Sequence, residues 1–510
     1  MRNWATFAAV ALFAVCSPPG AGGAEVRTWH TDSRFVDPSK AESGYNHPGS
    51  PPRPNALRVN VYLPNGYDPS SRRRYPVLFL LHGAGDAYDS WVLPGQGELM
   101  EIARGFRGII VMPEADRGYY TNWWNGGRRG DPGWERYHLD ELIPLVERRL
   151  PIRQKRRWHS IYGFSMGGMG AMFYASQRPH YFGSAGASQG TLSLQRPAFQ
   201  AEPAFRAFIE QDPQAIFGDP QAQEFYWAGH NPTKLVANLI NTRLYVAVGD
   251  GIPAEDENPG PGQLAELEVR MQSDEFVAAA RDAGVDVTYR PQGGTHAWPS
   301  RRRHLTYAIR EWGLFEPAVA TPAAWTYKTV ARLGRMWGFR FRFAEAPEEV
   351  NAFSLVADRL SGNGSGRVKI RAPGGCRFVA TLPFERALPP DCRASARRRP
   401  LCEGRRPTVI GTSGNDVLRG TGKSDVIVAR NGNDSVSGLG GNDRVCAGGG
   451  RDVVRGRKGK DRLVGQQGRD RLLGGPAGDR LEGGRGADTL IGGPGRDVLK
   501  GGRGTDDLSQ

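Results

Sequence analysis

Between residues 57 and 315 the chain alternates short apolar runs with longer stretches of helical spacing. Short apolar runs are typical of buried parallel strands, and we expect them over Leu57–Leu63, Val77–Leu81, Gly108–Met112, His159–Tyr162, Leu244–Val248 and Val285–Tyr289. Helices are expected over His138–Leu150, Met166–Gln177, Leu264–Ala283 and Arg301–Trp312. This alternation of strands and helices predicts a doubly wound, mostly parallel α/β sheet.

A change of spacing follows this region. Residues 317–336 are rich in Ala, Pro and Thr, which suggests a linker. Aromatic residues then alternate with Gly or Arg from Trp337 to Phe343, which is the period of a strand. We therefore expect a small β module over residues 337–410, with a Cys/Arg-rich tail. We interpret this module as a spacer, and a binding site is the alternative.

From residue 411 the chain repeats every nine residues, and residues 411–509 divide into eleven units without a gap. The sixth position of every unit is Asp, and the eighth is aliphatic, as in Leu418 and Leu472. Gly fills the first position in nine units and the fourth position in nine. A flexible Gly-rich linker would not keep eleven Asp residues in register, so the pattern indicates an ordered repeat of residues 411–510.

The start of the chain and its charge indicate where the protein is located. The order of a short charged start, an apolar run from Trp4 to Cys16 and small residues up to Ala24 predicts a signal peptide over residues 1–24. No later run is long enough to span a bilayer, so we expect no transmembrane segment and a secreted or cell-surface protein. The formal net charge of +14 is interpreted as a solvated basic surface, and no nucleic-acid partner is expected.

Cysteine usage agrees with export. Cys376, Cys392, Cys402 and Cys446 remain after removal of the signal peptide, and none lies in the α/β region. Four cysteines in an exported chain allow three disulfide pairings, which the sequence does not distinguish.

A candidate nucleophile lies at the end of a predicted strand. Gly163-Phe164-Ser165-Met166-Gly167 matches the pattern G-x-S-x-G, with an apolar strand before it and a helix of small residues after it. A Ser at such a sharp turn exposes its hydroxyl group, while the flanking Gly residues let strand and helix approach closely. We therefore assign Ser165 as the nucleophile, against the alternative of an incidental Ser in a Gly-rich turn.

The nucleophile needs a base, and the base needs an orienting carboxylate. His296 follows the last predicted strand and is the candidate base, whereas His304 lies within a helical pattern and is expected at the surface. The carboxylate is open between Asp250, at a strand end, and Glu266, on the next helix; the charges of residues 255–257 are expected in a solvated loop. Backbone N–H groups of Met166 and Ala84 are the candidate oxyanion hole.

Residues 55–315 resemble the esterase D-type branch of the α/β-hydrolases, which includes feruloyl esterases and secreted mycolyltransferases. The resemblance is carried by residues 81–85, 163–168 and 294–298, together with Trp123-Trp124 and Asn231-Pro232. It implies an α/β-hydrolase fold, and the pattern Glu-x-x-Val-Arg at residues 266–270 favours Glu266 as the acid. Mycolyltransferases carry Asp and Arg where this chain has His82 and Gly85, which favours a general carboxylester hydrolase.

The nine-residue units resemble RTX-type calcium-binding repeats, whose pattern is G-G-x-G-x-D-x-U-x. The resemblance implies a parallel β-roll in which Asp residues eighteen apart stack on one edge and bind Ca²⁺ through hard oxygen ligands. Asp461 lies between Lys460 and Arg462 and is left out of the candidates. The candidate calcium ligands are Asp416, Asp425, Asp434, Asp443, Asp452, Asp470, Asp479, Asp488, Asp497 and Asp506.

Together these features predict an α/β-hydrolase domain over residues 25–316, the linker, the β module and the roll. The leading hypothesis is a secreted serine carboxylester hydrolase or acyltransferase that acts on a small-molecule or cell-envelope ester, with structural Ca²⁺ in the repeats. The alternative is a non-catalytic extracellular calcium-binding or adhesive protein with a degenerate hydrolase domain.

Overall fold

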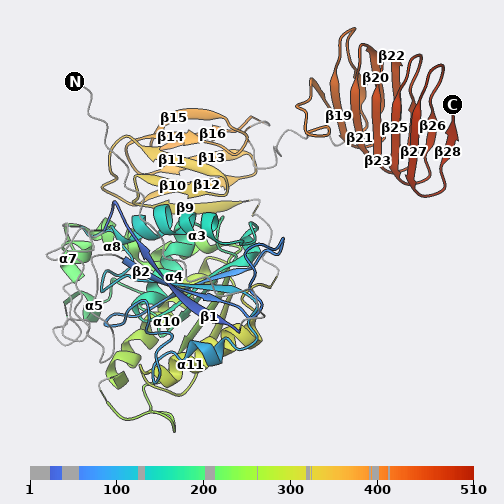
Figure 1. The fold of residues 1–510 in the computed structure, drawn as a ribbon. Helices are drawn as coiled ribbons and strands as arrows, with labels where there is room; N and C mark the ends of the chain where they lie inside the picture. The colour runs from blue at the N-terminus through green and yellow to red at the C-terminus, as the bar shows by residue number, and fades with distance from the viewer. Residues whose placement is uncertain are drawn as a thin grey trace, which may run out of the picture. The chain divides into compact units, whose positions relative to one another are not determined.

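The computed structural model describes residues 23–36, 57–124, 133–201, 213–260, 262–316, 322, 324–389, 392, 401–411 and 414–510. The chain divides into two compact units, residues 1–389 and residues 390–510 (Figure 1). The predicted signal peptide lies outside the described residues except for Gly23 and Ala24. Within the described residues, no helix is long and apolar enough to cross a membrane.

The first unit contains an eight-stranded sheet with the order β1-β2-β4-β3-β5-β6-β7-β8. The strands β1 and β2 form an antiparallel edge, and the strands from β4 to β8 run parallel. Their bounds are β1 Glu25–Thr31, β2 Leu57–Leu63, β3 Val77–Leu81, β4 Ile109–Pro113, β5 His159–Phe164, β6 Ser184–Ser188, β7 Arg243–Val248 and β8 Val287–Pro291.

Helices cover both faces of this sheet. On one face α3, α4 and α10 pack against alternate strand residues such as Val111 and Ile161, and on the other face α1 and α11 pack against residues such as Leu78 and Tyr162. The helices are α1 Leu99–Ile102, α2 Trp134–Arg136, α3 Ile143–Arg149, α4 Met166–Gln177, α5 Pro197–Ala201, α7 Pro213–Phe217, α8 Glu224–His230, α9 Pro232–Leu235, α10 Gly262–Asp282 and α11 Trp298–Tyr307. Short π- and 3₁₀-helical segments are η1 Tyr137–Leu142, η2 Arg156–Trp158, η3 Val236–Leu239 and η4 Ala308–Trp312.

The doubly wound architecture predicted from the hydrophobic pattern is confirmed. Two strands and one helix have the predicted bounds, namely β2, β3 and α4. The predicted helix over residues 138–150 begins earlier, at Trp134, and contains the π-helical segment η1. The strand β6 has the sequence Ser-Ala-Gly-Ala-Ser, which carries no apolar pattern although all five residues are buried.

The same unit contains a module of two four-stranded antiparallel sheets, β10-β11-β14-β15 and β16-β13-β12-β9. Their strands are β9 Trp325–Thr329, β10 Leu333–Met336, β11 Phe339–Phe343, β12 Asn351–Val356, β13 Arg359–Asn363, β14 Arg367–Arg371, β15 Arg377–Thr381 and β16 Phe384–Ala387. Buried aromatic rings fill the module, as in the stacked pair Phe341 and Phe353, whose centroids are 4.1 Å apart.

The predicted linker over residues 317–336 is wrong for its second half, because β9 and β10 lie there. Trp325 and Tyr327 belong to the aromatic core of the module. Asn238 lies in η3 of the α/β domain. Its side-chain amide donates to the carbonyl oxygen of Lys328 at 2.9 Å and accepts from the N–H of Lys328 at 2.8 Å. The segment after Ala324 is therefore a structural part of the module that packs on the α/β domain.

The second unit is a parallel β-roll, as the repeat pattern predicts. Alternate nine-residue repeats form two sheets, β17-β19-β21-β23-β25-β27 and β18-β20-β22-β24-β26-β28. Neighbouring strands pair residues eighteen apart, as in Val445, Leu463 and Leu481. The strands are β17 Val409–Ile410, β18 Val417–Arg419, β19 Val426–Asn431, β20 Ser435–Gly440, β21 Arg444–Gly449, β22 Val453–Lys458, β23 Arg462–Gln467, β24 Arg471–Leu473, β25 Arg480–Arg485, β26 Thr489–Ile491, β27 Val498–Arg503 and β28 Asp507–Ser509.

Aliphatic residues at the eighth position form the core of the roll. Eight of them, from Ile427 to Leu490, are fully buried in one cluster, whereas Leu508 in the last coil is 48% exposed. A short segment around Cys402 lies over one sheet, where Cys402 forms a disulfide with Cys446. Glu403 pairs there with Arg444 and Arg462. The disulfide selects one of the pairings that the sequence leaves open.

Candidate functional site

Ser165 lies at a sharp turn between β5 and α4. Its φ of 53° and ψ of −124° place it outside the conformations that most side chains adopt. Its backbone N–H donates to the carbonyl oxygen of Ser188 at 3.0 Å, and its carbonyl oxygen accepts from the N–H of Gly168 at 2.9 Å. This strained turn at the carboxyl end of a central parallel strand is the geometry of a nucleophile elbow.

The glycine at the first turn of α4 is required by close approach. A Cβ atom on Gly167 would lie 2.5 Å from the carbonyl oxygen of His82 and 2.7 Å from that of Leu81. The helix therefore packs directly against the turn that follows β3. This turn contains Ala84, so both candidate oxyanion residues, Met166 and Ala84, come from adjacent segments. Met166 is the first residue of α4, where backbone N–H groups have no partner within the helix.

Glu266 and His296 form a buried pair. The Nδ1 atom of His296 lies 2.9 Å from Oε2 of Glu266, and the Glu266 side chain is fully buried. The other carboxylate oxygen, Oε1, accepts a hydrogen bond from the N–H of Gly249. Burial lowers the pKa of His296 below its usual value, although the hydrogen bond to Glu266 opposes this shift. The neutral imidazole is therefore the dominant form at neutral pH.

Asp250 has a different environment from Glu266. Its carboxylate accepts hydrogen bonds from the backbone N–H groups of Ile252 at 2.9 Å and Gly294 at 3.2 Å. These bonds shape the loop that follows β7 and attach it to the loop that carries His296. Of the two acids that the sequence leaves open, the structure brings Glu266 to the imidazole.

Two side chains hold the histidine loop beside the nucleophile strand, and the sequence pattern did not identify either. Gln189, which follows β6, donates from its side-chain amide to the carbonyl oxygen of Thr295 at 2.5 Å. The Arg301 guanidinium stacks on Phe164, 4.1 Å from the ring centroid, and donates to the carbonyl oxygen of His296 at 3.1 Å. Since Phe164 immediately precedes Ser165, Arg301 links the candidate base to the strand of the candidate nucleophile.

Glu257 is buried, which corrects the expectation of a solvated loop charge. Its carboxylate accepts hydrogen bonds from the N–H of Thr295 at 2.6 Å, from the Thr295 hydroxyl at 2.9 Å and from Ser300. Arg303 also donates to it at 3.0 Å. Burial raises the pKa of Glu257, but these hydrogen bonds outweigh burial and hold the pKa below its usual value. Glu257 therefore fixes the residue next to His296.

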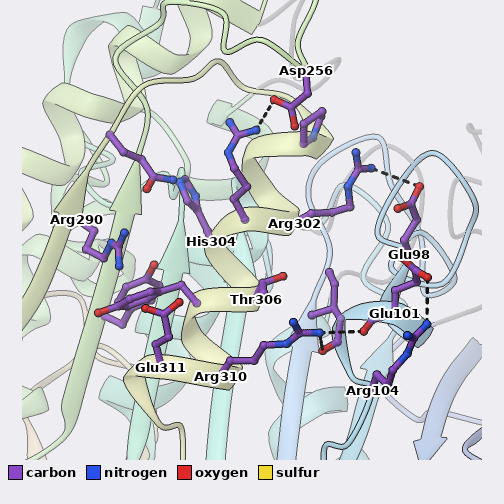
Figure 2. Close-up of a pocket in the computed structure, with 16 residues that line it drawn as sticks. Glu98, Glu101, Arg104, Asp256, Arg290, Arg302, His304, Thr306, Arg310 and Glu311 are labelled. Carbon is purple, nitrogen blue, oxygen red and sulfur yellow. Dashed lines mark hydrogen bonds and ion pairs between the residues drawn. The ribbon is translucent and has the colours of Figure 1, made fainter.

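His304 is buried rather than exposed, which corrects a second expectation. Its Nδ1 atom lies 2.7 Å from the hydroxyl oxygen of Ser188, and burial lowers its pKa to about 3. His304 lines a surface hollow of about 690 Å³ along α11 (Figure 2). None of the candidate catalytic residues lines this hollow, and several of its charges form ion pairs, as in Arg303 with Asp256 and Arg302 with Glu98. We therefore do not identify it as the active site.

The second candidate site follows the two edges of the roll. On each edge, the backbone N–H of a sixth-position Asp donates to Oδ1 of the Asp eighteen residues later, at distances from 2.7 to 3.0 Å. One edge carries the series from Asp416 to Asp506, and the other carries the series from Asp425 to Asp497. The stacked Asp residues that the repeats predict are therefore present.

Most of the other carboxylate oxygens have no hydrogen-bond partner among the described residues. Oδ2 of Asp425 is an exception, because it accepts from the N–H and the hydroxyl group of Thr421. The Oδ2 atoms of eight Asp residues, from Asp434 to Asp497, are buried without a hydrogen bond. A Cβ atom on Gly474 would lie 2.5 Å from Oδ2 of Asp479 and 2.7 Å from the carbonyl oxygen of Gly492. Carboxylate and carbonyl oxygens therefore meet where the repeat has glycine, and this donor set fits Ca²⁺. The described residues contain no cluster of three His, Cys, Asp or Glu side chains, so carbonyl oxygens are needed to complete a site.

Asp461, which the sequence analysis left out, lies in the same ladder. Its Oδ1 atom accepts from the N–H of Asp443, and its Oδ2 atom is buried without a partner. The neighbouring Lys460 and Arg462 do not pair with it, because consecutive side chains of the roll point in different directions. Arg462 instead pairs with Glu403. The reason for excluding Asp461 is therefore not supported by the geometry.

Known proteins are similar to part of this chain. Esterase MT1326 of Mycobacterium tuberculosis (strain CDC 1551 / Oshkosh) is 30% identical over 195 residues, which are 38% of this chain and 42% of that protein. Diacylglycerol acyltransferase/mycolyltransferase Ag85B of Mycobacterium avium is 26% identical over 238 residues, which are 44% of this chain and 70% of that protein. The chain thus spans less than half the length of the esterase that it matches.

A solved structure, the substrate-bound fluorophosphonate-binding serine hydrolase FphF of Staphylococcus aureus, is 17% identical, with a TM-score of 0.43, and covers 57% of this chain and 99% of that one. The model of the RTX calcium-binding nonapeptide repeat matches residues 410–445, 447–481 and 473–508, so the roll is made of RTX repeats. The model described as "Putative esterase" matches residues 53–311, which are just over half of the 510 residues, and the chain therefore belongs to the putative esterase family.

Proposed function

We propose that the chain is an exported serine carboxylester hydrolase with the triad Ser165, His296 and Glu266, and that its RTX roll is stabilised by Ca²⁺. The observation that carries the proposal is the buried contact of 2.9 Å between His296 Nδ1 and Glu266 Oε2, in a chain of the putative esterase family. A carboxylate at Nδ1 favours the tautomer in which Nδ1 carries the proton and Nε2 acts as the base.

In the proposed reaction, the Ser165 hydroxyl oxygen attacks the acyl carbon of the ester, and its proton passes to Nε2 of His296. Negative charge develops on the former carbonyl oxygen, and the N–H groups of Met166 and Ala84 stabilise it. His296 then returns the proton to the departing alkoxide, which leaves as an alcohol. The acyl-enzyme that remains is resolved by water, which His296 deprotonates in turn.

Transfer to an acceptor alcohol uses the same steps, with the alcohol in place of water. This variant of the proposal is supported by the similarity to the mycolyltransferase named above. The absence of the Asp and Arg that flank the first oxyanion turn in such enzymes favours hydrolysis, since His82 and Gly85 occupy those positions. His82 is buried, with its Nε2 atom 3.0 Å from the N–H of Ala115, so its side chain does not face a bound acceptor.

In the roll, the unpartnered Oδ2 atoms and the glycine carbonyl oxygens would hold Ca²⁺. The ion supplies positive charge between carboxylates that otherwise repel one another within each ladder. Because unpaired buried carboxylates oppose folding, the free energy of calcium binding would contribute directly to the folding of the unit. Residence outside the cell suits this arrangement, since calcium concentrations there match sites of about 10⁻⁴–10⁻³ M affinity.

The test is the hydrolysis of p-nitrophenyl esters by the purified chain and by Ser165→Ala. We expect the substitution to lower kcat/KM by about 10³-fold or more, with Ser70→Ala, at an exposed loop position, as the matched control. Release of p-nitrophenol in the presence and absence of added alcohols separates hydrolysis from transfer. Full activity of Ser165→Ala would contradict the proposal, and an inactive wild-type chain that still folds with Ca²⁺ would favour the alternative of a non-catalytic calcium-binding protein.

A further inference from the structure

One face of the β module carries only basic charge. The outward side chains of the sheet β10-β11-β14-β15 include six arginines and one lysine, and all seven are exposed. They are Arg335, Arg340, Arg342, Arg367, Lys369, Arg371 and Arg377. Between residues 324 and 389 the chain has eleven Lys and Arg against five Asp and Glu, so this face holds most of the positive charge of the module.

The register of the sheet places four of these arginines in a single row. Arg335 is opposite Arg340, Arg340 is opposite Arg371, and Arg371 is opposite Arg377. Arg342 and Lys369 are opposite one another in the next row. Neighbouring strands are about 4.8 Å apart, so the row extends for about 14 Å across the four strands. Like charges in directly opposed positions destabilise a sheet.

The four strands of this sheet contain no acidic residue, although the charge of Asp140 in the hydrolase domain acts on Arg335. Within the part of the chain that the structure describes, none of the seven side chains takes part in an ion pair, whereas Arg359 on the other sheet of the module pairs with Glu385 at 3.2 Å. The buried aromatic core below the face includes Phe339 and Phe341. It stabilises the module and so offsets this repulsion. Arginines that repel one another and form no ion pair among the described residues indicate a surface that binds negative charge on another molecule.

Basic side chains of the hydrolase domain lie next to this face. Arg178 of that domain and Arg342 of the face line the same hollow, of about 380 Å³, in which Asp140 pairs with Arg178 at 3.1 Å. Close by, the Arg156 guanidinium lies 4.9 Å from the centroid of the Trp337 ring, at the turn between β10 and β11. Arg156 Nη1, Trp337 Nε1 and His180 Nδ1 are buried and have no hydrogen-bond partner in the described part of the chain.

The electrostatic environment of His180 agrees with this geometry. Burial is the first cause that lowers its pKa, to about 3, and the charges of Arg178, Arg335, Arg156 and Arg340 lower it further. The positive charges of the face and those of the hydrolase domain therefore both act on His180. A partner with several negative groups would relieve repulsion on both sides of the junction.

We infer that the face of β10-β11-β14-β15 binds an acidic polysaccharide, whose anionic groups are carboxylates or sulfates. Guanidinium groups match such groups with two parallel hydrogen bonds, and a row of cations about 4.8 Å apart suits an extended chain with repeated charges. The choice of a polysaccharide over an acidic protein rests on the proposed export of the chain, whereas the charge arrangement is independent of the proposed function. In this role the module would hold the esterase on a polymer rather than serve as a spacer.

Other polyanions fit the face less well. Its outward residues include no aromatic side chain on which the bases of a nucleic acid could stack. Its apolar members are Leu333 and Val379, and it lacks the Trp and Tyr residues that anchor proteins at a membrane interface. A small anion would leave most of the row uncompensated.

The test measures binding of the full chain, in Ca²⁺, to immobilised hyaluronan, dextran sulfate and neutral dextran. The variant is Arg340→Glu with Arg377→Glu, which makes every directly opposed pair in the row, with Arg335 and with Arg371, a pair of opposite charges. Two controls carry the same change in net charge: Arg72→Glu with Arg74→Glu on an exposed hydrolase loop, and Arg485→Glu with Arg503→Glu on the roll. Thermal unfolding checks that each variant folds.

We expect the wild-type chain to bind at least one of the two acidic polymers, more weakly as salt is added, and to ignore neutral dextran. The face variant should lose about tenfold or more in affinity, and each control should lose less than about threefold. Preference for hyaluronan or for dextran sulfate identifies the anion. The inference is overturned if neither acidic polymer binds, if the roll variant loses as much as the face variant, or if DNA, polyglutamate or anionic vesicles bind more tightly than both polymers.

Discussion

The Nδ1 atom of His296 and the Oε2 atom of Glu266 lie 2.9 Å apart, although their residues are 30 positions apart in the chain. The carboxylate also accepts the N–H of Gly249, at the end of β7. It is thus attached to the strand end where the competing acid, Asp250, is found. The carboxylate of Glu266, on the helix that follows β7, therefore contacts the imidazole, whereas that of Asp250, at the end of β7, holds the loop.

Glu266→Gln should therefore cost far more activity than Asp250→Asn. The amide keeps the shape of the side chain but no longer fixes the imidazole tautomer or stabilises its cation, and we expect kcat to fall by about 10³–10⁴-fold. Asp250→Asn retains an acceptor for the N–H groups of Ile252 and Gly294, so we expect a loss of less than about tenfold. Steady-state kinetics on one chromogenic ester measures both variants. The opposite ranking would assign the acid to Asp250.

The pH dependence of hydrolysis reports the protonation of His296. Burial lowers the pKa of this imidazole, and catalysis requires the neutral form as the base. Activity should therefore persist below the usual histidine pKa of about 6.5, with the acidic limb of kcat/KM at lower pH. A profile of kcat/KM from pH 4 to pH 9 measures this limb. A midpoint clearly above 6.5 would mean that a different group controls the reaction, or that His296 is stabilised as a cation.

Glu257 offers a test of how the histidine loop is held. Glu257→Ala removes the acceptor of the Thr295 N–H and hydroxyl and of Ser300, and leaves buried donors unsatisfied, which costs about 1–3 kcal/mol of unfolding free energy. We expect a lower Tm and a lower kcat, with an unchanged midpoint of the acidic limb because Glu266 still faces His296. Glu255→Ala is the matched control, since Glu255 is exposed in the same loop. Equal Tm values for the two variants would contradict a positioning role.

Periodic and strongly apolar elements could be predicted from the sequence, and the structure places them within a few residues. The strands β2 and β3 and the helix α4 have the predicted bounds because their apolar residues are continuous or regularly spaced. The strand β6 escaped prediction because its residues are small. Its Gly186 lies against the ring of Tyr162, where a Cβ atom would overlap that ring, so tertiary packing rather than local pattern selects the strand.

In the candidate site too, some residues could be predicted from the local sequence pattern and others depend on tertiary packing. Ser165 and His296 could be named as candidates because their neighbours follow a known spacing, and the roll could be predicted because eleven Asp residues keep one register. Residues that act through tertiary contacts could not be identified in this way. Arg301 and Glu257 appeared as ordinary charges in a basic helix and an acidic loop, and only the fold shows that both are buried against the histidine loop. Likewise, the arginine row of the β module depends on the register of four strands.

The roll should respond to pH in opposite directions with and without calcium. In the metal-free roll, burial raises the pKa of Asp452 and Asp479 to about 6 and that of Asp461 and Asp470 to about 7, whereas the unfolded value is about 3.9. A pKa raised by folding means that the protonated form is favoured in the folded state. Stability is then highest in acid and is lost as the pH rises through about 6 to 7. Calcium binding instead requires ionised carboxylates, so its contribution grows over the same range.

We therefore expect residues 390–510, which form one compact unit with the Cys402–Cys446 disulfide, to unfold at a lower temperature at pH 8 than at pH 5 in EDTA. In millimolar Ca²⁺ the order should reverse, and Mg²⁺ should not replace Ca²⁺, because it demands tighter octahedral geometry. Circular dichroism melting curves at the two pH values, each in Ca²⁺, in Mg²⁺ and in EDTA, measure these effects. Asp507→Asn, at an exposed position outside the ladders, is the control for Asp470→Asn. If Tm in EDTA rises with pH, the buried Oδ2 atoms are not protonated in the metal-free roll. If Ca²⁺ leaves the melting curves unchanged at pH 8, the metal does not occupy them. Both results together would mean that basic side chains stabilise the ladders instead.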